Sequence, residues 1–278
     1  MTSGAESTRD RDKRHHQRTL FDDIAERYDA SRPGYPAHVV EFITTTAGLG
    51  PRSAVLEIGC GTGQLTERLA SFGFQLTAID IGPAMIAAAR RRLANDLADD
   101  RAGDLADAQV CLQATSFEDL VTADASFDLV ISSAAFHWID PEVAFAKSAR
   151  LLRPGVWLAL LGTEERYDDP VGEALDALWI KHGDTGGAWQ RRPSDPEAVD
   201  AAGLFGTPVT LADSQRTVLP ALDVIALEST RATFLSWSPD TQRQFTDELR
   251  RLLEPTPAVH LTRHTSVTMA QVPPRTVS

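Results

Sequence analysis

Cysteine is scarce in this sequence. Of 278 residues only Cys60 and Cys111 are cysteines, and their spacing fits neither a metal site nor a disulfide framework. We therefore expect no resident metal and a reducing, cytoplasmic setting. Long apolar runs are lacking too: no stretch approaches the roughly 18–20 apolar residues of a membrane span. The N-terminus lacks the apolar core of a signal peptide.

Basic residues are outnumbered, with 27 Lys and Arg against 39 Asp and Glu and a net charge of −12. Nucleic-acid scaffolds need a basic footprint, and anionic membranes attract polybasic segments, so both partners are disfavoured. The basic side chains that do cluster lie in residues 1–19. This polar segment has little to bury, which predicts a flexible tail.

From residue 20 onward, short apolar strands alternate with amphipathic helices. Five strands are expected, at residues 54–58, 75–80, 110–114, 127–132 and 156–161. This alternation predicts an α/β fold with a doubly wound, mostly parallel sheet, whose ligands bind beyond the carboxyl ends of the strands. Two later strands, 207–219 and 261–272, are expected to form an antiparallel hairpin at one edge, which makes seven strands.

Residues 20–278 are expected to form one domain with four parts. Residues 20–50 form N-terminal helices, and residues 51–162 form the ligand-binding core. Residues 163–205 are a less regular insertion with a helix at 171–182. Residues 206–278 combine the edge hairpin with helices at 221–235 and 239–253.

The first strand runs into a glycine cluster, VLEIGCGTG at residues 55–63. A strand, a tight turn and a helix start cradle nucleotides. The dinucleotide pattern is G-x-G-x-x-G, whereas this turn reads G-x-G-x-G and carries Glu57, which would repel a pyrophosphate. Asp80 ends the second strand, where an acid accepts both ribose hydroxyls, and Ile81 can pack against an adenine. S-adenosylmethionine has the ribose, adenine and positive charge that this site favours, and no phosphate.

The glycine cluster with Asp80, FDLV at 127–130 and LLRPG at 151–155 resembles the class I S-adenosylmethionine-dependent methyltransferases. The segment FDDIAERYD at 21–29 is similar to the lid helices of the small-molecule enzymes. AFHW at 135–138 resembles a subgroup that acts on small acids and antibiotic-like metabolites. The resemblance implies a seven-stranded sheet with its last strand antiparallel, and S-adenosylmethionine as cofactor with S-adenosylhomocysteine as product.

The resemblance also implies two sets of site residues. The cofactor set is Tyr28, Arg32, Glu57, Gly59, Cys60, Gly61, Gly63, Gln64, Asp80, Ile81, Met85, Ser116, Phe117 and Ser132. The acceptor pocket is Phe136, His137, Trp138, Glu164, Tyr167, Trp179 and Trp189.

Particular roles follow for a few of these side chains. Arg32 would neutralise the cofactor carboxylate, and Tyr28 would lie over the methionine or the methyl group as one of two catalytic residues. The other is His137, which follows the fourth strand and is a candidate base, unless it only packs locally.

One departure concerns the adenine. The family often places an acid after the third strand, but residues 114–118 read ATSFE, so Ser116, the Phe117 backbone or Glu118 would replace it.

The predicted function is transfer of a methyl group to an oxygen or nitrogen of a small metabolite, as in antibiotic biosynthesis. The partner is a small-molecule acceptor, and a homo-oligomer is compatible with the sequence. Three alternatives stay open: a cofactor-binding protein without methyl transfer, a C-methyltransferase, and a nucleotide-binding oxidoreductase.

Overall fold

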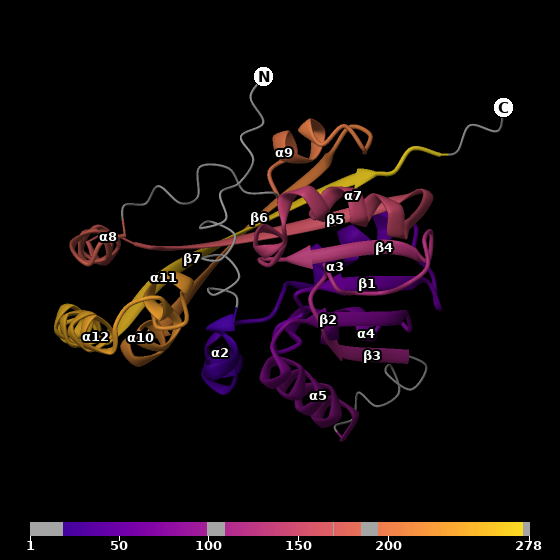
Figure 1. Cartoon of the computed structure of the whole chain (residues 1–278). Coiled ribbons are helices and arrows are strands. Elements are labelled where there is room, and N and C mark those ends of the chain that lie inside the picture. The colour runs from indigo at the N-terminus through magenta and orange to yellow at the C-terminus, as the bar shows by residue number, and fades with distance from the viewer. Residues whose placement is uncertain (1–18, 99–108, 169, 185–193, 275–278) are drawn as a thin grey trace.

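The computed structural model describes residues 19–98, 109–168, 170–184 and 194–274 (Figure 1). The predicted flexible tail at residues 1–19 lies outside this part of the chain except for Thr19. None of the described helices is long and apolar enough to cross a membrane.

A single seven-stranded sheet of order β3-β2-β1-β4-β5-β7-β6 organises the described residues. Its strands are β1 (Ala54–Ile58), β2 (Gln75–Asp80), β3 (Gln109–Ala114), β4 (Phe127–Ser133), β5 (Leu152–Tyr167), β6 (Val209–Pro220) and β7 (Ala258–Gln271). Strands β1 to β5 pair in parallel, and β7 is antiparallel to both β5 and β6. The predicted fold class is confirmed, including the antiparallel last strand.

Helices cover both faces of the sheet. They are η1 (Asp22–Ile24), α2 (Ala25–Ser31), α3 (Ala37–Thr46), α4 (Gln64–Ala70), α5 (Pro83–Ala98), η2 (Phe136–Trp138), α7 (Pro141–Leu151), α8 (Val171–Lys181), α9 (Pro196–Ala201), α10 (Ala221–Glu228), α11 (Ala232–Leu235) and α12 (Pro239–Leu253). Successive side chains of β1 point to opposite faces of the sheet and pack against different helices. Val55 packs with Val39 of α3 and Leu65 of α4, whereas Leu56 joins a cluster with Leu151 of α7. Both faces of the parallel strands are therefore buried, as a doubly wound sheet requires.

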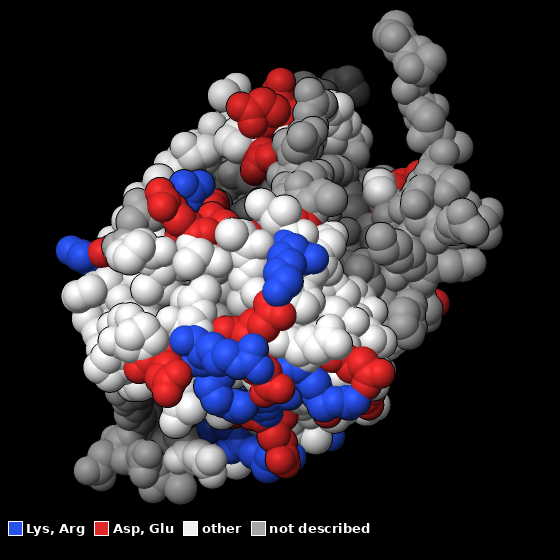
Figure 2. Space-filling view, turned by 90° about the vertical axis from the view of Figure 1, so that its left-hand side faces the viewer, with Lys and Arg blue, Asp and Glu red and all other residues white. Residues whose placement is uncertain are grey.

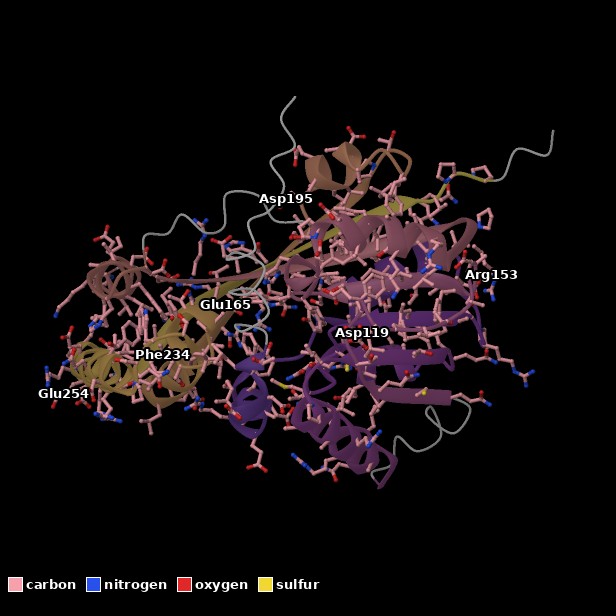
Figure 3. The ribbon with its side chains drawn as sticks, in the orientation of Figure 1. Asp119, Arg153, Glu165, Asp195, Phe234 and Glu254 are labelled. Atoms are coloured by element: carbon pink, nitrogen blue, oxygen red, sulfur yellow. The ribbon has the colours of Figure 1, made fainter. Side chains whose placement is uncertain are left out.

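The molecule has two regions with separate hydrophobic cores. Strands β5, β6 and β7 extend past the other strands and carry α8, α10, α11 and α12 (Figure 1). Leu175 of α8, Phe234 of α11 and Phe245 of α12 pack there against Val259 of β7. We call this region the outer half, and strands β1–β4 with α3, α4, α5 and α7 the core half. Figure 3 shows Phe234 in the outer half and Asp119 in the core half.

The surface of the outer half mixes charges of both signs (Figure 2). Lys181 pairs with Glu248 at 2.7 Å and Arg250 with Asp247 at 3.3 Å. Interspersed charges of this kind keep a surface soluble without creating a field of one sign.

The structure corrects the predicted course of β5. The fifth strand was expected to start at residue 156, yet β5 starts at Leu152, and the Pro-Gly pair at residues 154–155 lies at an irregularity where pairing with β4 skips from Leu152 to Trp157. The strand then runs to Tyr167 instead of ending near residue 161. Its polar second half is held by hydrogen bonds with β7, out to the pair of Tyr167 and Leu261, rather than by apolar burial.

Smaller corrections concern the helices. The predicted helix over 221–235 is two helices, α10 and α11, separated by a turn at Ser229–Arg231. Helix α9 was not predicted, because its six residues are too few to display a helical period. The N-terminal helix begins with the 3-10 turn η1 before α2.

Candidate active site

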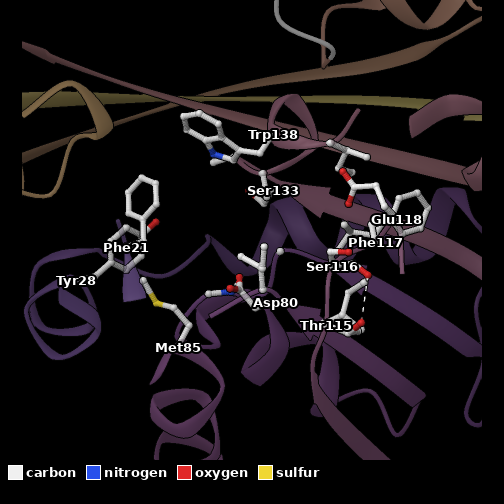
Figure 4. A pocket seen from close by; sticks show the side chains of 18 residues that line it. Phe21, Tyr28, Asp80, Met85, Thr115, Ser116, Phe117, Glu118, Ser133 and Trp138 are labelled. Carbon is white, nitrogen blue, oxygen red and sulfur yellow. Dashed lines mark hydrogen bonds between the residues drawn. The ribbon is translucent and has the colours of Figure 1, made fainter. Parts of the chain in front are cut away.

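A cleft opens at the carboxyl ends of β1, β2, β3 and β4 (Figure 4). Parallel sheets bind their ligands at this edge. Its volume is about 720 Å³ with the open mouth included. Phe21 and Tyr28 of the N-terminal helices form one wall, and the loop after β3 forms the opposite one.

The glycine turn forms the floor of the cleft next to β1. Gly59 has a φ of +70°, and a Cβ placed on it would lie 2.2 Å from the Ala135 Cβ. No side chain fits at that distance, so the close approach of the turn to the segment after β4 requires glycine. The amides of Gly59 and Cys60 both donate to the Ile79 carbonyl, at 2.8 and 3.0 Å, which ties the turn to β2.

Asp80 lies at the end of β2 with its carboxylate on the cleft wall. Its Oδ2 accepts from the Gly61 amide at 3.0 Å and its Oδ1 from the Gly82 amide at 2.9 Å. Burial raises the pKa of Asp80 above its ordinary value, although these two amides oppose the shift. Each carboxylate oxygen has a second lone pair, so Asp80 can still accept hydrogen bonds from a ligand.

Buried polar atoms surround the turn. Within the described residues, Oε2 of Glu57, Oγ1 of Thr62 and Nε2 of Gln64 are buried and have no hydrogen-bond partner. Burial, with a smaller contribution from the charge of Asp80, raises the pKa of Glu57 to about 8 against the effect of the Thr66 hydroxyl. Unsatisfied buried groups are uncommon in folded proteins. A polar, cationic ligand would suit them, so the residues of this turn fit the amino-acid end of S-adenosylmethionine.

The loop after β3 forms one wall of the cleft and holds the candidate replacements for the acid that the family often has there. Thr115, Ser116, Phe117 and Glu118 all line the cleft. The Ser116 hydroxyl donates to Asp119 at 2.6 Å, and Oε1 of Glu118 accepts from the Asp140 amide at 3.1 Å. Glu118 is thus the carboxylate of this loop that lines the cleft.

Three aromatic rings face the cleft at its lid side (Figure 4). The Phe21 ring lies edge-on to Tyr28 at 5.9 Å and to Trp138 at 6.2 Å between centroids. Phe21 was not among the predicted site residues. Its spacing predicts a helix but does not indicate which side of that helix faces the cleft.

Two contacts hold the N-terminal helices over the core half. Oδ1 of Asp22 accepts from the amides of Ala84 at 2.7 Å and Met85 at 3.2 Å, which caps the N-terminus of α5. Arg92 of α5 pairs with Asp29 of α2 at 2.7 Å. A sequence signal for the cap exists: glycine precedes Pro83, so α5 has no capping side chain of its own.

The structure brings about half of the predicted residues together at the cleft. The predicted residues on its wall are Tyr28, Gly59, Gly61, Asp80, Ile81, Met85, Ser116, Phe117 and Trp138. Five predicted cofactor residues lie behind the wall: Glu57, Cys60, Gly63, Gln64 and Ser132. Their positions support the turn rather than face the cleft. The Ser132 hydroxyl, for example, donates to the Ile58 carbonyl at 2.9 Å and joins β4 to β1.

Arg32 also lies off the cleft wall. Its Nε donates to the Thr230 hydroxyl at 3.1 Å, its guanidinium lies 3.8 Å from Glu165, and it stacks on the Tyr28 ring at 5.3 Å. These contacts connect the lid helices to the outer half. They engage the guanidinium that was expected to meet a cofactor carboxylate.

The segment after β4 divides its side chains between core and cleft. Trp138 lines the cleft, whereas Phe136 is buried against Phe145 at 5.1 Å between ring centroids. The His137 imidazole packs beside the Trp138 ring at 4.5 Å and does not line the cleft. The 3-10 turn η2 explains this, because its three consecutive side chains point in three directions.

Three predicted acceptor residues lie elsewhere because β5 is long. Glu164 is within β5, half exposed, and pairs with Arg166 at 2.8 Å. Tyr167 and Trp179 were expected at the pocket, but both donate to the buried carboxylate of Glu228, at 2.7 and 2.9 Å. They belong to the core of the outer half. Trp189 lies outside the described residues.

Comparison with known proteins places this geometry in a family. Residues 56–160, which hold the glycine turn and Asp80, match the model of a methyltransferase domain. This segment is thus similar to a methyltransferase domain. An uncharacterized methyltransferase of Mycobacterium tuberculosis is 34% identical over 134 residues, which cover 48% of this chain and 48% of that protein. The chain thus spans about half the length of the curated relatives it matches.

Solved structures extend the likeness to the whole methyltransferase fold. A protein of Anaeromyxobacter dehalogenans assigned as a type II methyltransferase superposes with a TM-score of 0.58 at 23% identity, covering 88% of this chain and 99% of that one. Phosphoethanolamine N-methyltransferase 2 of Haemonchus contortus, solved with S-adenosyl-L-methionine, has a TM-score of 0.54 at 18% identity over 99% of this chain and 62% of its own. These likenesses confirm the predicted fold of the class I methyltransferases.

Proposed function

We propose that this protein transfers a methyl group from S-adenosylmethionine to an oxygen or nitrogen atom of a small metabolite. The observation that carries the proposal is the position of Asp80 beside the glycine turn and on the wall of a cleft, within a segment similar to a methyltransferase domain. Asp80 would accept the ribose hydroxyls, as an acid at this place does in related nucleotide sites. The buried polar atoms of Glu57, Thr62 and Gln64 lie behind the glycine turn, and we propose that this turn meets the amino-acid end of the cofactor.

The bound cofactor would supply a methyl group already activated by its sulfonium charge. The chain then has to align an acceptor and exclude water. Phe21, Tyr28 and Trp138 are suited to both tasks, because their rings close one side of the cleft. The Tyr28 ring face can also lie near a cation. We assign His137 no proton transfer, since its imidazole packs beside the Trp138 ring and does not line the cleft.

The size of the cleft supports a small acceptor. Cofactor and acceptor would share one cleft of about 720 Å³ with the open mouth included, which is the size range of small-molecule sites rather than of a macromolecular surface. The fold is known from a named N-methyltransferase of a small phosphorylated amine, which makes nitrogen acceptors a sensible first group for screening. A tailoring step on a cytoplasmic metabolite is the role we propose.

Calorimetry with S-adenosylhomocysteine, with NAD as control, tests the cofactor assignment. Micromolar binding of S-adenosylhomocysteine alone is the expected result, and a screen of small amines, phenols and acids by mass spectrometry would then seek a methyl gain. Binding of NAD, or of neither compound, would contradict the proposal.

A further inference from the structure

One lysine outside the cleft contacts the backbone of the cleft wall three times. Nζ of Lys147, on α7, donates to the carbonyls of Phe117 at 2.6 Å, Leu120 at 2.7 Å and Glu118 at 3.0 Å. An ammonium has three N–H donors and all three are used here. The same ammonium lies 5.2 Å from the centroid of the Phe117 ring. Hydrogen bonds from a charged donor are stronger than neutral ones, so this contact holds the loop firmly.

The loop held by Lys147 is the one that lines the cleft after β3. Phe117 and Glu118 are on the cleft wall, and their carbonyls are two of the three acceptors. Phe117 is 3% exposed and so is packed as tightly as a core residue. The position of the Phe117 ring and of the Glu118 carboxylate therefore depends on where these carbonyls are held.

Helix α7 holds this loop at a second point. The amide of Asp140, the N-cap residue of α7, donates to Oε1 of Glu118 at 3.1 Å. Asp140 precedes the helix and Lys147 lies two turns along it. The two contacts fix the loop against rotation as well as displacement, because they act on its side chain and its backbone.

We propose that Lys147 is a positioning residue that sets the shape of the base-binding end of the cleft. The inference depends on the proposed function, since it takes the wall opposite Phe21 and Tyr28 as the place of the adenine. Lys147 touches neither cofactor nor acceptor and acts through Phe117 and Glu118. Without the ammonium, three carbonyls would lose their donor and the loop would move to find water.

The test compares Lys147→Met with Arg150→Met. Methionine keeps the length and the apolar stem of lysine but has no donor. Arg150 lies on the same helix, is exposed, and pairs with Asp124 without contacting the loop. We expect K147M to weaken S-adenosylhomocysteine binding about tenfold while R150M binds like the unaltered protein.

Two further readouts separate positioning from a general loss of stability. Hydrogen exchange of the unliganded protein should rise in peptides covering residues 115–120 of K147M and not in R150M. The preference for S-adenosylhomocysteine over its inosine analogue, which differs only at the purine, should shrink in K147M. Equal affinity, preference and loop exchange in the two variants would overturn the proposal.

If K147M does not unfold cooperatively, Lys147→Arg decides the question. Arginine keeps the charge but its planar fork cannot direct donors to three converging carbonyls. We expect weaker binding and faster loop exchange, and a K147R protein unchanged in both would overturn the assignment. The loop-exchange measurement needs no ligand, so absence of binding by the unaltered protein would refute the proposed function while leaving the Lys147 result readable.

Discussion

The two halves differ in how one buried carboxylate of each is hydrogen-bonded: Glu228 in the outer half and Glu57 in the core half. In the outer half, Glu228 is fully buried and accepts from Tyr167, Trp179 and Arg231, the last at 2.9 Å. In the core half, buried polar atoms of Glu57 and Gln64 lack partners within the described residues. Satisfied buried groups stabilise a fold, whereas unsatisfied ones lower its stability and are often found next to a binding site. We therefore expect ligands to bind at the cleft of the core half.

Charged side chains also connect the N-terminal helices to the outer half. Glu165 of β5 accepts from Arg263 of β7 at 2.9 Å and lies 3.8 Å from Arg32 of the lid. Burial would raise the pKa of Glu165, but the charges of Arg32 and Arg263 outweigh it and hold the pKa below its ordinary value. Glu165 is thus ionised at neutral pH, and the lid is connected to the outer half by charge.

The largest expected effect comes from replacing one glycine in each half by alanine. Gly59→Ala should abolish folding or cofactor binding, because its φ is +70° and the new Cβ would meet the Ala135 Cβ at 2.2 Å. Gly183→Ala in the outer half has a φ of +95° with open space around it, so it should cost only about 1 kcal/mol. Thermal unfolding of both variants checks this, and a well-folded, fully active G59A protein would refute the described turn.

The paired carboxylate of the outer half should affect stability and not binding. Glu228→Ala leaves Tyr167, Trp179 and Arg231 without their acceptor, and we expect a loss of about 3 kcal/mol. Glu248→Ala, which removes an exposed partner of Lys181, should change little. Urea unfolding measures the first effect. A large fall in the S-adenosylhomocysteine affinity of the folded E228A protein would contradict the claim that Glu228 contributes to stability and not to binding.

Asp80 should show the reverse behaviour. Asp80→Asn keeps the shape but removes the charge and one acceptor, so S-adenosylhomocysteine affinity should fall by about tenfold or more. The unfolding free energy should change much less than in E228A. Calorimetry and urea unfolding of the same preparation give both numbers. Unchanged affinity would remove Asp80 from the ribose site.

The pH dependence of stability isolates Glu57. Its pKa of about 8 in the folded protein is above that of the unfolded chain, so the folded state binds one more proton between about pH 5 and pH 8. The free energy of unfolding should therefore fall as pH rises through this window, by up to about 1.4 kcal/mol per pH unit. Asp80 contributes in the same direction. Glu57→Gln should flatten the slope, and an identical slope in both proteins would show that Glu57 ionises freely.

The sequence predictions were accurate where the structural role of a residue follows from its neighbours along the chain. The turn at 55–63 and Asp80 were identified because strand, glycine and acid occur in order, and all seven strands were expected within a few residues, apart from the end of β5. Tyr167 and Trp179 were predicted at the acceptor pocket, but the structure places both against Glu228, which is 61 and 49 residues away. No pattern near either residue indicates such a partner.

The sequence by itself determined the order of strands and helices, the glycine turn and the acid after β2, because each depends on short-range periodicity and backbone freedom. Only the tertiary structure decided which side chains meet. It set Trp138 rather than His137 on the cleft wall, extended β5 by pairing with β7, and brought Lys147 to the loop at Phe117. The physical reason is that side-chain direction and strand length depend on packing partners distant in the chain, which local propensity does not contain.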